Sequence, residues 1–428
     1  MKITKSSEKI NPFGGFNFCV KLLKDMGIPS LFDQLLGSRG ESALYNYSDI
    51  LQSHLAIYLH GGDCTEDINE HLRGHLQSVR GLKVCSADTI LRTIKELSTP
   101  QQEYISSSGV THYFNINQPL NSLLLKTLKK TNQLNTRTGY TLDYDNQVIA
   151  TEKFDALKTY KKYEGYQPGV AAIGKCIVHV EGRNGNSQAK YQQKETLERV
   201  FNSLQQEDIK IKNYRADSAS YQKEVIGLVQ QHAENFYIRA TRCANMDALI
   251  GEIQESEWTT IKMDGQQMDI AEIPDYKPFN GANAYRLIIT RIKRKDNQAD
   301  LFSGKAYTYR GILTDDYQST SKDIFLFYNK RGGAERIFDT QNNDFGWAKL
   351  PCSHLNHNTT FMILTAIYAN LYQFMIAKFS QKLSWLNENF RPKKFIFRFI
   401  IVASKWIKTG GRYILKLYTH KDYSPLLH

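Results

Sequence analysis

Four acidic residues stand in the sequence where strand and helix periodicity could bring carboxylates together. Asp143 and Asp145 lie two apart in an alternating segment, so we expect both side chains on one face of a strand. Asp217 directly follows a second alternating segment, residues 209–216, and Glu335 lies near the start of an expected helix. Carboxylates that converge from two strands and a helix provide the oxygen ligands that Mg²⁺ prefers.

Two further polar side chains precede the glutamate by about one and two helical turns. Tyr328, Arg331 and Glu335 fall on one helix face at about 100° per residue. An arginine one turn from a glutamate can hold a phosphate or orient the carboxylate. Two divalent ions about 3.5–4 Å apart would activate the attacking oxygen and stabilise the leaving oxygen in phosphoryl transfer. The spacing therefore indicates metal-dependent phosphoryl transfer.

The elements that must position these acids follow from the hydrophobic pattern. After residue 135 the chain alternates strand-like and helix-like segments, which is typical of an α/β or α+β domain. Residues 245–323 then read as short strands and turns, and residues 324–328 are predicted to form a strand that leads into the helix of Arg331 and Glu335. The other expected elements are strands at 140–150, 171–180, 209–216 and 235–240, and helices at 196–206, 221–233 and 361–379.

The first 135 residues are expected to be mainly helical. Residues 46–60 and 86–97 place apolar side chains at helical spacing, with Ser86 or Asp88 available as a cap for the second helix. The polar face of that second helix suits the base-reading helix of a helix-turn-helix motif. A plain amphipathic helix with a solvated face explains the same pattern, so both interpretations stay open. The residues expected on this face are Thr89, Arg92, Thr93 and Lys95.

The charge of the chain favours a polyanionic partner. Its 428 residues carry 55 Lys and Arg against 43 Asp and Glu, a formal net charge of +12, which favours nucleic acid. Residues 391–428 hold nine Lys and Arg against one acid, interleaved with aromatic side chains, so we expect an ordered element that faces phosphate. The expected DNA contacts are Arg92 and Lys95, the central basic cluster Arg291, Lys293, Arg294 and Lys295, and the C-terminal Lys405, Lys408, Arg412 and Lys416.

Other features predict a soluble cytoplasmic protein. The six cysteines form no CxxC pair, which argues against a cysteine zinc site or a disulfide framework. The polar N-terminus has no apolar core of signal-peptide length. Residues 361–379 approach the length of a membrane span but include Thr365, Asn370 and Gln373, so we expect a buried helix and no membrane contact.

The segments that carry the acids resemble the DDE transposases of bacterial insertion sequences, most closely the branch numbered 1380. This branch is related to the group-four transposases, whose Tyr–two–Arg–three–Glu signature matches Tyr328, Arg331 and Glu335. The second acid of the family matches Asp217, and the similarity runs from about residue 80 to the C-terminus. The matching segments are LDYDNQ (142–147), GYQPG (165–169), YRADSASY (214–221), FYNKRGGAERIFD (327–339) and the basic tail.

The resemblance implies a DNA transposase. Asp145, or alternatively Asp143, would hold two Mg²⁺ ions, or Mn²⁺ in their place, together with Asp217 and Glu335. Arg331 and Tyr328 would contact phosphate near the cleaved bond. Such an enzyme would bind the terminal inverted repeats of its element, cleave the strands and join the 3′-OH ends to target DNA. It would act as a homodimer on double-stranded DNA at the bacterial nucleoid.

The resemblance and the sequence pattern together imply four parts. A helical N-terminal region (1–135) is the candidate DNA-binding part, and a ribonuclease H-like catalytic core (136–244 and 324–380) is interrupted by a β-rich insertion (245–323). A basic aromatic region (381–428) ends the chain. Two alternatives remain: a decayed or repurposed copy that binds DNA without cutting it, and a ribonuclease H-like nuclease without strand transfer.

Overall fold

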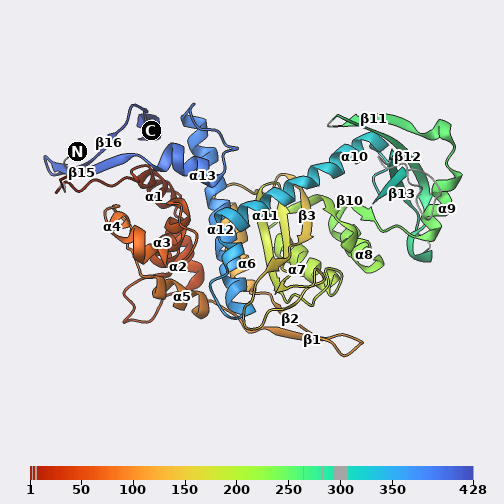
Figure 1. Ribbon diagram of the computed structural model, residues 1–428, viewed down its shortest axis with the longest axis horizontal. Helices are drawn as coiled ribbons and strands as arrows, with labels where there is room; N and C mark the ends of the chain where they lie inside the picture. The colour runs from red at the N-terminus through yellow and green to blue at the C-terminus, as the bar shows by residue number, and fades with distance from the viewer. Residues whose placement is uncertain (2, 5–6, 264, 282, 294–306, 428) are drawn as a thin grey trace.

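A large mixed β-sheet runs through the centre of the protein (Figure 1). The computed structural model describes residues 1–428 except 2, 5–6, 264, 282, 294–306 and 428. In the described part the sheet has 11 strands in the order β1-β2-β8-β7-β3-β9-β10-β14-β13-β12-β11. The chain therefore has a mixed α/β fold in which helices cover one continuous sheet.

The five central strands fix where the acids lie. Strand β3 (Gly139–Asn146) pairs in parallel with β9 (Lys210–Ala216), which pairs in parallel with β10 (Ala233–Ala240). Parallel neighbours end at the same edge of a sheet, so the carboxyl ends of β3 and β9 lie side by side. On the other side of β3 the antiparallel hairpin of β7 (Gly169–Ile173) and β8 (Cys176–Arg183) completes the centre.

The segment expected to be β-rich extends this same sheet. Strand β14 (Tyr307–Thr314) pairs antiparallel with β10, and β13 (Tyr285–Lys293), β12 (Gln266–Tyr276) and β11 (Thr259–Met263) follow outward. Helix α9 (Ala244–Glu252) connects β10 to these strands. At the opposite edge the hairpin of β1 (Gln102–Ile105) and β2 (Thr111–Asn115) pairs with β8.

The predicted strand at 324–328 is wrong, because these residues belong to helix α10 (Ser321–Asn329). The Thr320 hydroxyl caps the helix by accepting from the Asp323 N–H at 3.2 Å, and Ile324, Phe325 and Tyr328 form its buried side. The backbone stays helical through the turn Lys330–Gly332 into α11 (Gly333–Asp344). One long helical segment therefore runs beside the central strands in Figure 1.

Two smaller predictions also need correction. Residues 171–180 form the end of β7 and most of β8 rather than one strand, because Gly174 takes a positive φ of 60° in the turn between them. Thr93 lies on the buried side of helix α5 (Ala87–Glu96), whereas Arg92 and Lys95 are exposed. Ser86 caps that helix as expected, accepting from the Thr89 N–H.

The two ends of the chain lie together (Figure 1). The N-terminal helices pack beside a C-terminal hairpin, with bridges that join Asn11 to Ser404 and Phe13 to Val402. The C-terminal residues are thus an ordered part of the N-terminal module. Its elements are α1 (Phe16–Asp25), α2 (Ile28–Leu36), α3 (Tyr47–Leu59), α4 (Arg73–Leu76), α13 (Pro392–Phe395), β15 (Ala403–Thr409) and β16 (Arg412–Tyr418).

The apolar segment around residues 361–379 is a core helix. Helix α12 (Leu355–Lys382) is long and apolar enough to cross a membrane, but 89% of its apolar window is buried inside the protein. Its polar side chains have protein partners: the Thr365 hydroxyl accepts from the Trp347 indole N–H at 2.9 Å. The other helices that cover the sheet are α6 (Gln118–Lys130), α7 (Gln193–Gln206) and α8 (Lys223–His232). A separate small sheet consists of β4 (Ile149–Ala150), β5 (Leu157–Lys158) and β6 (Glu164–Tyr166).

Two buried asparagine side chains hydrogen-bond backbone groups of β8 in the way that a neighbouring strand would. The Asn370 side chain of α12 bonds both the N–H and the C=O of Ile177, at 3.0 and 2.8 Å. The Asn121 side chain of α6 does the same at Val180, at 2.9 Å for each bond. Strand β2 pairs with β8 only further along, at Gly182 and Arg183. The side-chain amides of Asn370 and Asn121 therefore satisfy backbone N–H and C=O groups of β8 that would otherwise be buried and unpaired.

Replacing Asn370 by Ala should therefore destabilise the protein. The substitution leaves a buried N–H and a buried C=O of Ile177 unsatisfied, at about 1–3 kcal/mol each, so we expect a loss of about 2–5 kcal/mol in unfolding free energy. Urea unfolding measures this, with the exposed Asn389→Ala as control at about 0.5 kcal/mol or less. Equal effects of the two substitutions would contradict the role assigned to Asn370.

Candidate active site

Three aspartates gather at the carboxyl ends of two adjacent parallel strands. Asp143 and Asp145 lie on one face of β3, and Asp217 directly follows β9. The register pairs Asp143 with Arg215, so Arg215 and Asp217 occupy the same face of the neighbouring strand. Helix α10 and the turn after it lie against this face, which brings Tyr328 and Arg331 to the acids.

Asp143 is committed to a buried ion pair. Both of its carboxylate oxygens accept from the Arg215 guanidinium, at 2.8 Å from Nε and 2.7 Å from Nη2. Both side chains are buried. Arg215 also donates to the carbonyl of Phe327 at 2.6 Å and lies over the Phe327 ring. This arginine therefore ties together β3, β9 and α10.

Asp145 faces a different arginine. An oxygen of its carboxylate lies 2.8 Å from Nη2 of Arg331. Burial raises the pKa of Asp145 to about 6, with the positive charge of Arg331 opposing this rise and the negative charge of Asp217 adding to it. The Asp145 and Asp217 carboxylates therefore repel each other, and a bound cation would relieve this repulsion.

Asp217 and Tyr328 are held by local hydrogen bonds. The Asp217 carboxylate accepts from the Ala219 N–H at 3.0 Å and so caps the turn Ser218–Ser220. The Tyr328 hydroxyl donates to the carbonyl of Ala216 at 3.2 Å. Tyr328 is thus buried against the end of β9, and its hydroxyl positions the helix rather than pointing into solvent.

Glu335 stands one helical turn beyond Arg331. The backbone between them is helical, so their Cβ atoms are about 5–6 Å apart. The Glu335 side chain is exposed, and it makes no hydrogen bond or ion pair within the described part of the chain. The structure thus brings Arg331 to Asp145 and Tyr328 to the end of β9, beside Asp217. The Glu335 carboxylate is exposed one turn from Arg331, and in the described part of the chain its oxygens and those of the two aspartates do not all lie within 4.8 Å of one another, as a ready metal site would require them to.

The sequence matches the family Transposase DDE domain group 1 over residues 2–428. The chain belongs to this family of DDE transposases. It is therefore an enzyme of metal-dependent DNA cleavage and strand transfer, which explains clustered carboxylates in a protein of net positive charge. A solved structure described as a cryo-EM structure of a piggyBac transposase synaptic complex with hairpin DNA is similar over 91% of this chain and 79% of that chain, at 10% identity and a TM-score of 0.46. No curated protein matches the sequence.

Arg291 of the transposase does not fit the DNA contact expected for it. Its guanidinium is buried and ion-paired with Glu255 at 2.6 Å and with Asp269 at 2.9 Å. The rings of Trp258 and Tyr307 lie 4.2 and 4.7 Å from it. Lys293 is exposed at the end of β13, whereas Arg294 and Lys295 lie outside the described residues. The charge of Arg291 therefore stabilises the outer strands of the sheet.

The C-terminal hairpin exposes most of its expected basic residues. Lys408, Arg412 and Lys416 are exposed, whereas Lys405 is half-buried and ion-paired with Glu8. Next to them Arg80 of the N-terminal module lies 3.3 Å from the centre of the Tyr413 ring. The hairpin is therefore a folded basic surface, of which Lys405 is partly neutralised.

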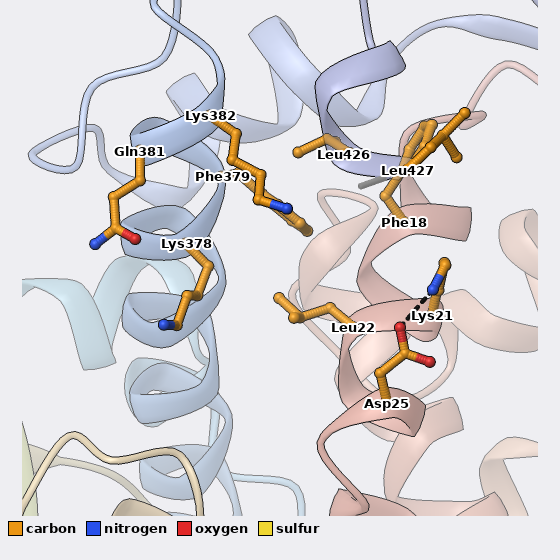
Figure 2. A pocket seen from close by; sticks show the side chains of 10 residues that line it. All are labelled: Phe18, Lys21, Leu22, Asp25, Lys378, Phe379, Gln381, Lys382, Leu426 and Leu427. Atoms are coloured by element: carbon orange, nitrogen blue, oxygen red, sulfur yellow. Dashed lines mark hydrogen bonds and ion pairs between the residues drawn. The ribbon is translucent and has the colours of Figure 1, made fainter.

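A groove of about 340 Å³ lies on another part of the transposase (Figure 2). It is formed by α1, the end of α12 and the C-terminal turn, and none of the candidate catalytic residues lines it. Three lysines and one aspartate surround its apolar floor, with Lys21 ion-paired to Asp25 at 2.5 Å. The lining residues are Phe18, Lys21, Leu22, Asp25, Lys378, Phe379, Gln381, Lys382, Leu426 and Leu427.

Arg215 is the residue of this site that sequence analysis missed. A signal for it existed, because Arg215 precedes Asp217 by two residues just as Asp143 precedes Asp145. Period-two alternation places each pair on one strand face. What the sequence lacked was the register, which sets Arg215 directly opposite Asp143.

Burial raises the pKa of both β3 aspartates, but only Asp143 has both oxygens bound by a buried arginine, so substitution of the two residues should affect stability differently. The folded protein keeps a proton on Asp145 up to about pH 6, whereas an unfolded chain releases it near pH 4, so ionisation of Asp145 costs folding stability as the pH rises through this window. Asp145→Asn should therefore stabilise the metal-free protein by about 1–3 kcal/mol at pH 7 and lose this gain by pH 4. Asp143→Asn breaks a buried ion pair and should cost about 3–5 kcal/mol.

Urea unfolding in EDTA at several pH values measures both effects. Asp143→Asn serves as the matched control, since it removes the same charge from the same strand two residues away. Destabilisation by Asp145→Asn at pH 7 would show that Asp145 is structural.

Proposed function

We propose that this transposase acts in the manner of the insertion-sequence branch numbered 1380. It binds the terminal inverted repeats of its element, cleaves the DNA strands and joins the freed 3′-OH ends to target DNA. Asp145, Asp217 and Glu335 would hold two Mg²⁺ ions, or Mn²⁺ in their place. The observation that carries this proposal is the pairing of Asp145 with Arg331 beside Asp217 at adjacent strand ends.

The arrangement of the aspartates supports Asp145 as the first catalytic acid. Asp143 has both oxygens occupied by Arg215, so it offers little to a metal without loss of a buried ion pair. One oxygen of Asp145 lies 2.8 Å from Nη2 of Arg331 and the other accepts from the Asn146 N–H at 2.9 Å, so no arginine among the described residues holds both oxygens of this carboxylate. Burial and the negative charge of Asp217 raise its pKa. A divalent cation would favour the ionised form of such a group.

The donor set suits hard divalent ions. Oxygen ligands from Asp145 and Asp217, with the accessible Glu335 on the adjacent helix, leave coordination sites for water and phosphate. Bound metal would supply activation of the attacking oxygen and stabilisation of the leaving oxygen. Arg331 orients the Asp145 carboxylate and can turn to a DNA phosphate, while Tyr328 fixes the helix that carries both Arg331 and Glu335.

The fold supports the same proposal at a coarser level. The central strands β8, β7, β3, β9 and β10 have the order and directions expected of a ribonuclease H-like core, with acids at the ends of β3 and β9. Residues 245–323 would be the β-rich insertion of that core. DNA ends would lie against the C-terminal hairpin and the exposed Arg92 and Lys95, and a homodimer would hold two ends.

Neutral variants of the acids test the enzyme mechanism. Asp145→Asn, Asp217→Asn and Glu335→Gln keep side-chain shape but remove the metal-binding charge, so nicking and strand transfer should fall by several orders of magnitude. Binding to the ends should persist. The assay uses DNA with the inverted repeats that flank the coding region, in Mg²⁺ and in Mn²⁺.

The outcomes separate the proposal from its rivals. Unchanged cleavage by all three variants would exclude this metal site. A parent protein that binds its ends but cuts nothing favours a decayed DNA-binding copy. Cleavage without joining favours a nuclease. Glu198→Gln, an exposed glutamate of α7, is the matched control and should cut normally.

The C-terminal hairpin should supply affinity that does not depend on sequence. Each phosphate neutralised contributes about 0.9 to the slope of log affinity against log salt, so Lys408, Arg412 and Lys416 replaced by Gln should reduce the slope by about 2–3. Titrations of specific and random duplexes should weaken alike. The matched variant Arg291→Gln removes a buried charge that already has protein partners, and a correctly folded sample should keep the parental slope. An unchanged slope in the hairpin variant would show that the hairpin does not contact DNA.

A further inference from the structure

A loop of unusual composition rises from the strand end that carries Asp145. Residues 151–164, which we term the flap, leave β3 through β4 and return through β6 to β7. At its base the Thr151 N–H donates to the Glu164 carbonyl at 3.1 Å, and β7 begins where Gly169 pairs with Asn146. Between these two points Ile149 pairs with Tyr166, so the flap extends outward from the same edge of the sheet that carries Asp145.

The flap exposes aromatic rings together with lysines. Phe154 is 84% exposed and Tyr160 is 66% exposed, and Tyr163 is also exposed. Large aromatic side chains are normally at least partly buried, so two such rings on one loop indicate a binding surface. The lysines interleaved with the rings are Lys153, Lys158, Lys161 and Lys162.

The flap is firmly anchored, so this exposure is not a property of a loose loop. Both oxygens of Asp155 accept from the Leu355 N–H at the start of α12, at 3.0 and 2.9 Å, and one also accepts from the Tyr166 hydroxyl. The Thr159 hydroxyl donates to the Tyr163 carbonyl at 2.8 Å. The edge of the His354 ring supports Phe154, with ring centres 5.3 Å apart. The rings therefore stand on a rigid base.

Rings interleaved with lysines suit a nucleic-acid strand whose bases are unpaired. The faces of bases inside a duplex are covered by their neighbours, so along a DNA strand an exposed side-chain ring stacks on bases that have left the stack, and otherwise meets a free base face only at the terminal pair of a duplex. Lysines beside the rings suit the phosphates of the same strand. A protein partner fits less well, since lysine is depleted at the core of protein interfaces.

We propose that the flap binds unpaired nucleotides of the DNA strand beside the cleaved bond. Phe154 and Tyr160 stack on bases, and Lys158, Lys161 and Lys162 contact the phosphates. This inference rests on the proposed function, because it assigns to the DNA end a single-stranded or opened segment at the sheet edge that carries Asp145.

Binding of the full-length protein in EDTA, where cleavage is excluded, tests the flap. The probes are a blunt random-sequence duplex and the same duplex with a single-stranded thymidine tail. The parent protein should prefer the tailed duplex. Phe154→Leu and Tyr160→Leu keep an apolar side chain but lose the flat ring, so each should reduce the preference about 5- to 100-fold and leave blunt-duplex affinity unchanged. Phe154→Trp should keep the preference.

The control and the contrary outcomes are distinct. Tyr317→Leu changes a ring that is 56% exposed on another loop and should have no effect. A parent protein that binds both duplexes equally, or a Phe154→Leu variant that keeps the preference, overturns the assignment of the flap. Failure of the parent protein to bind either duplex contradicts the proposed function instead.

Discussion

The buried ion pair between Asp143 and Arg215 is the contact on which the geometry of the site depends. It joins adjacent parallel strands at the level of the candidate catalytic acids, and the same guanidinium donates to the carbonyl of Phe327. A buried arginine with one carboxylate and one carbonyl in fixed directions restricts how α10 lies against the sheet. Because Arg331 and Glu335 continue that helix, their distances from Asp145 and Asp217 follow from this contact.

The two aspartates of β3, Asp143 and Asp145, therefore differ in how their charges are compensated. Burial raises the pKa of both carboxyl groups. Asp143 has both oxygens on the Arg215 guanidinium, whereas Arg331 contacts one oxygen of Asp145, and the charge of Asp217 raises the pKa of Asp145 further. In its ionised form such a carboxylate lowers the stability of the metal-free folded protein, and it favours binding of a cation. In the proposed metal site, folding stability and metal affinity would therefore oppose each other, as is common at catalytic sites.

The same strand end also connects the candidate catalytic site to the flap. The flap is fixed to the first turn of α12 through Asp155, and α12 in turn completes the edge of β8 through Asn370. The core helix therefore supports both the sheet that carries the acids and the loop proposed to hold DNA. Rigid support of this kind keeps a bound strand in a fixed position relative to the carboxylates.

Local periodicity in the sequence was enough to predict helices α3, α5 and α7, strands β3 and β9, and the placement of Asp143 with Asp145 on one face. It could not tell which aspartate is paired, because the partner lies 72 residues away and the register of parallel strands is set by packing. For the same reason Arg291 looked like a free charge, although Glu255 and Asp269 neutralise it. The predicted strand at 324–328 failed because a short apolar run fits a strand or a buried helix face equally well, and only the packing of α10 on the sheet decides between them.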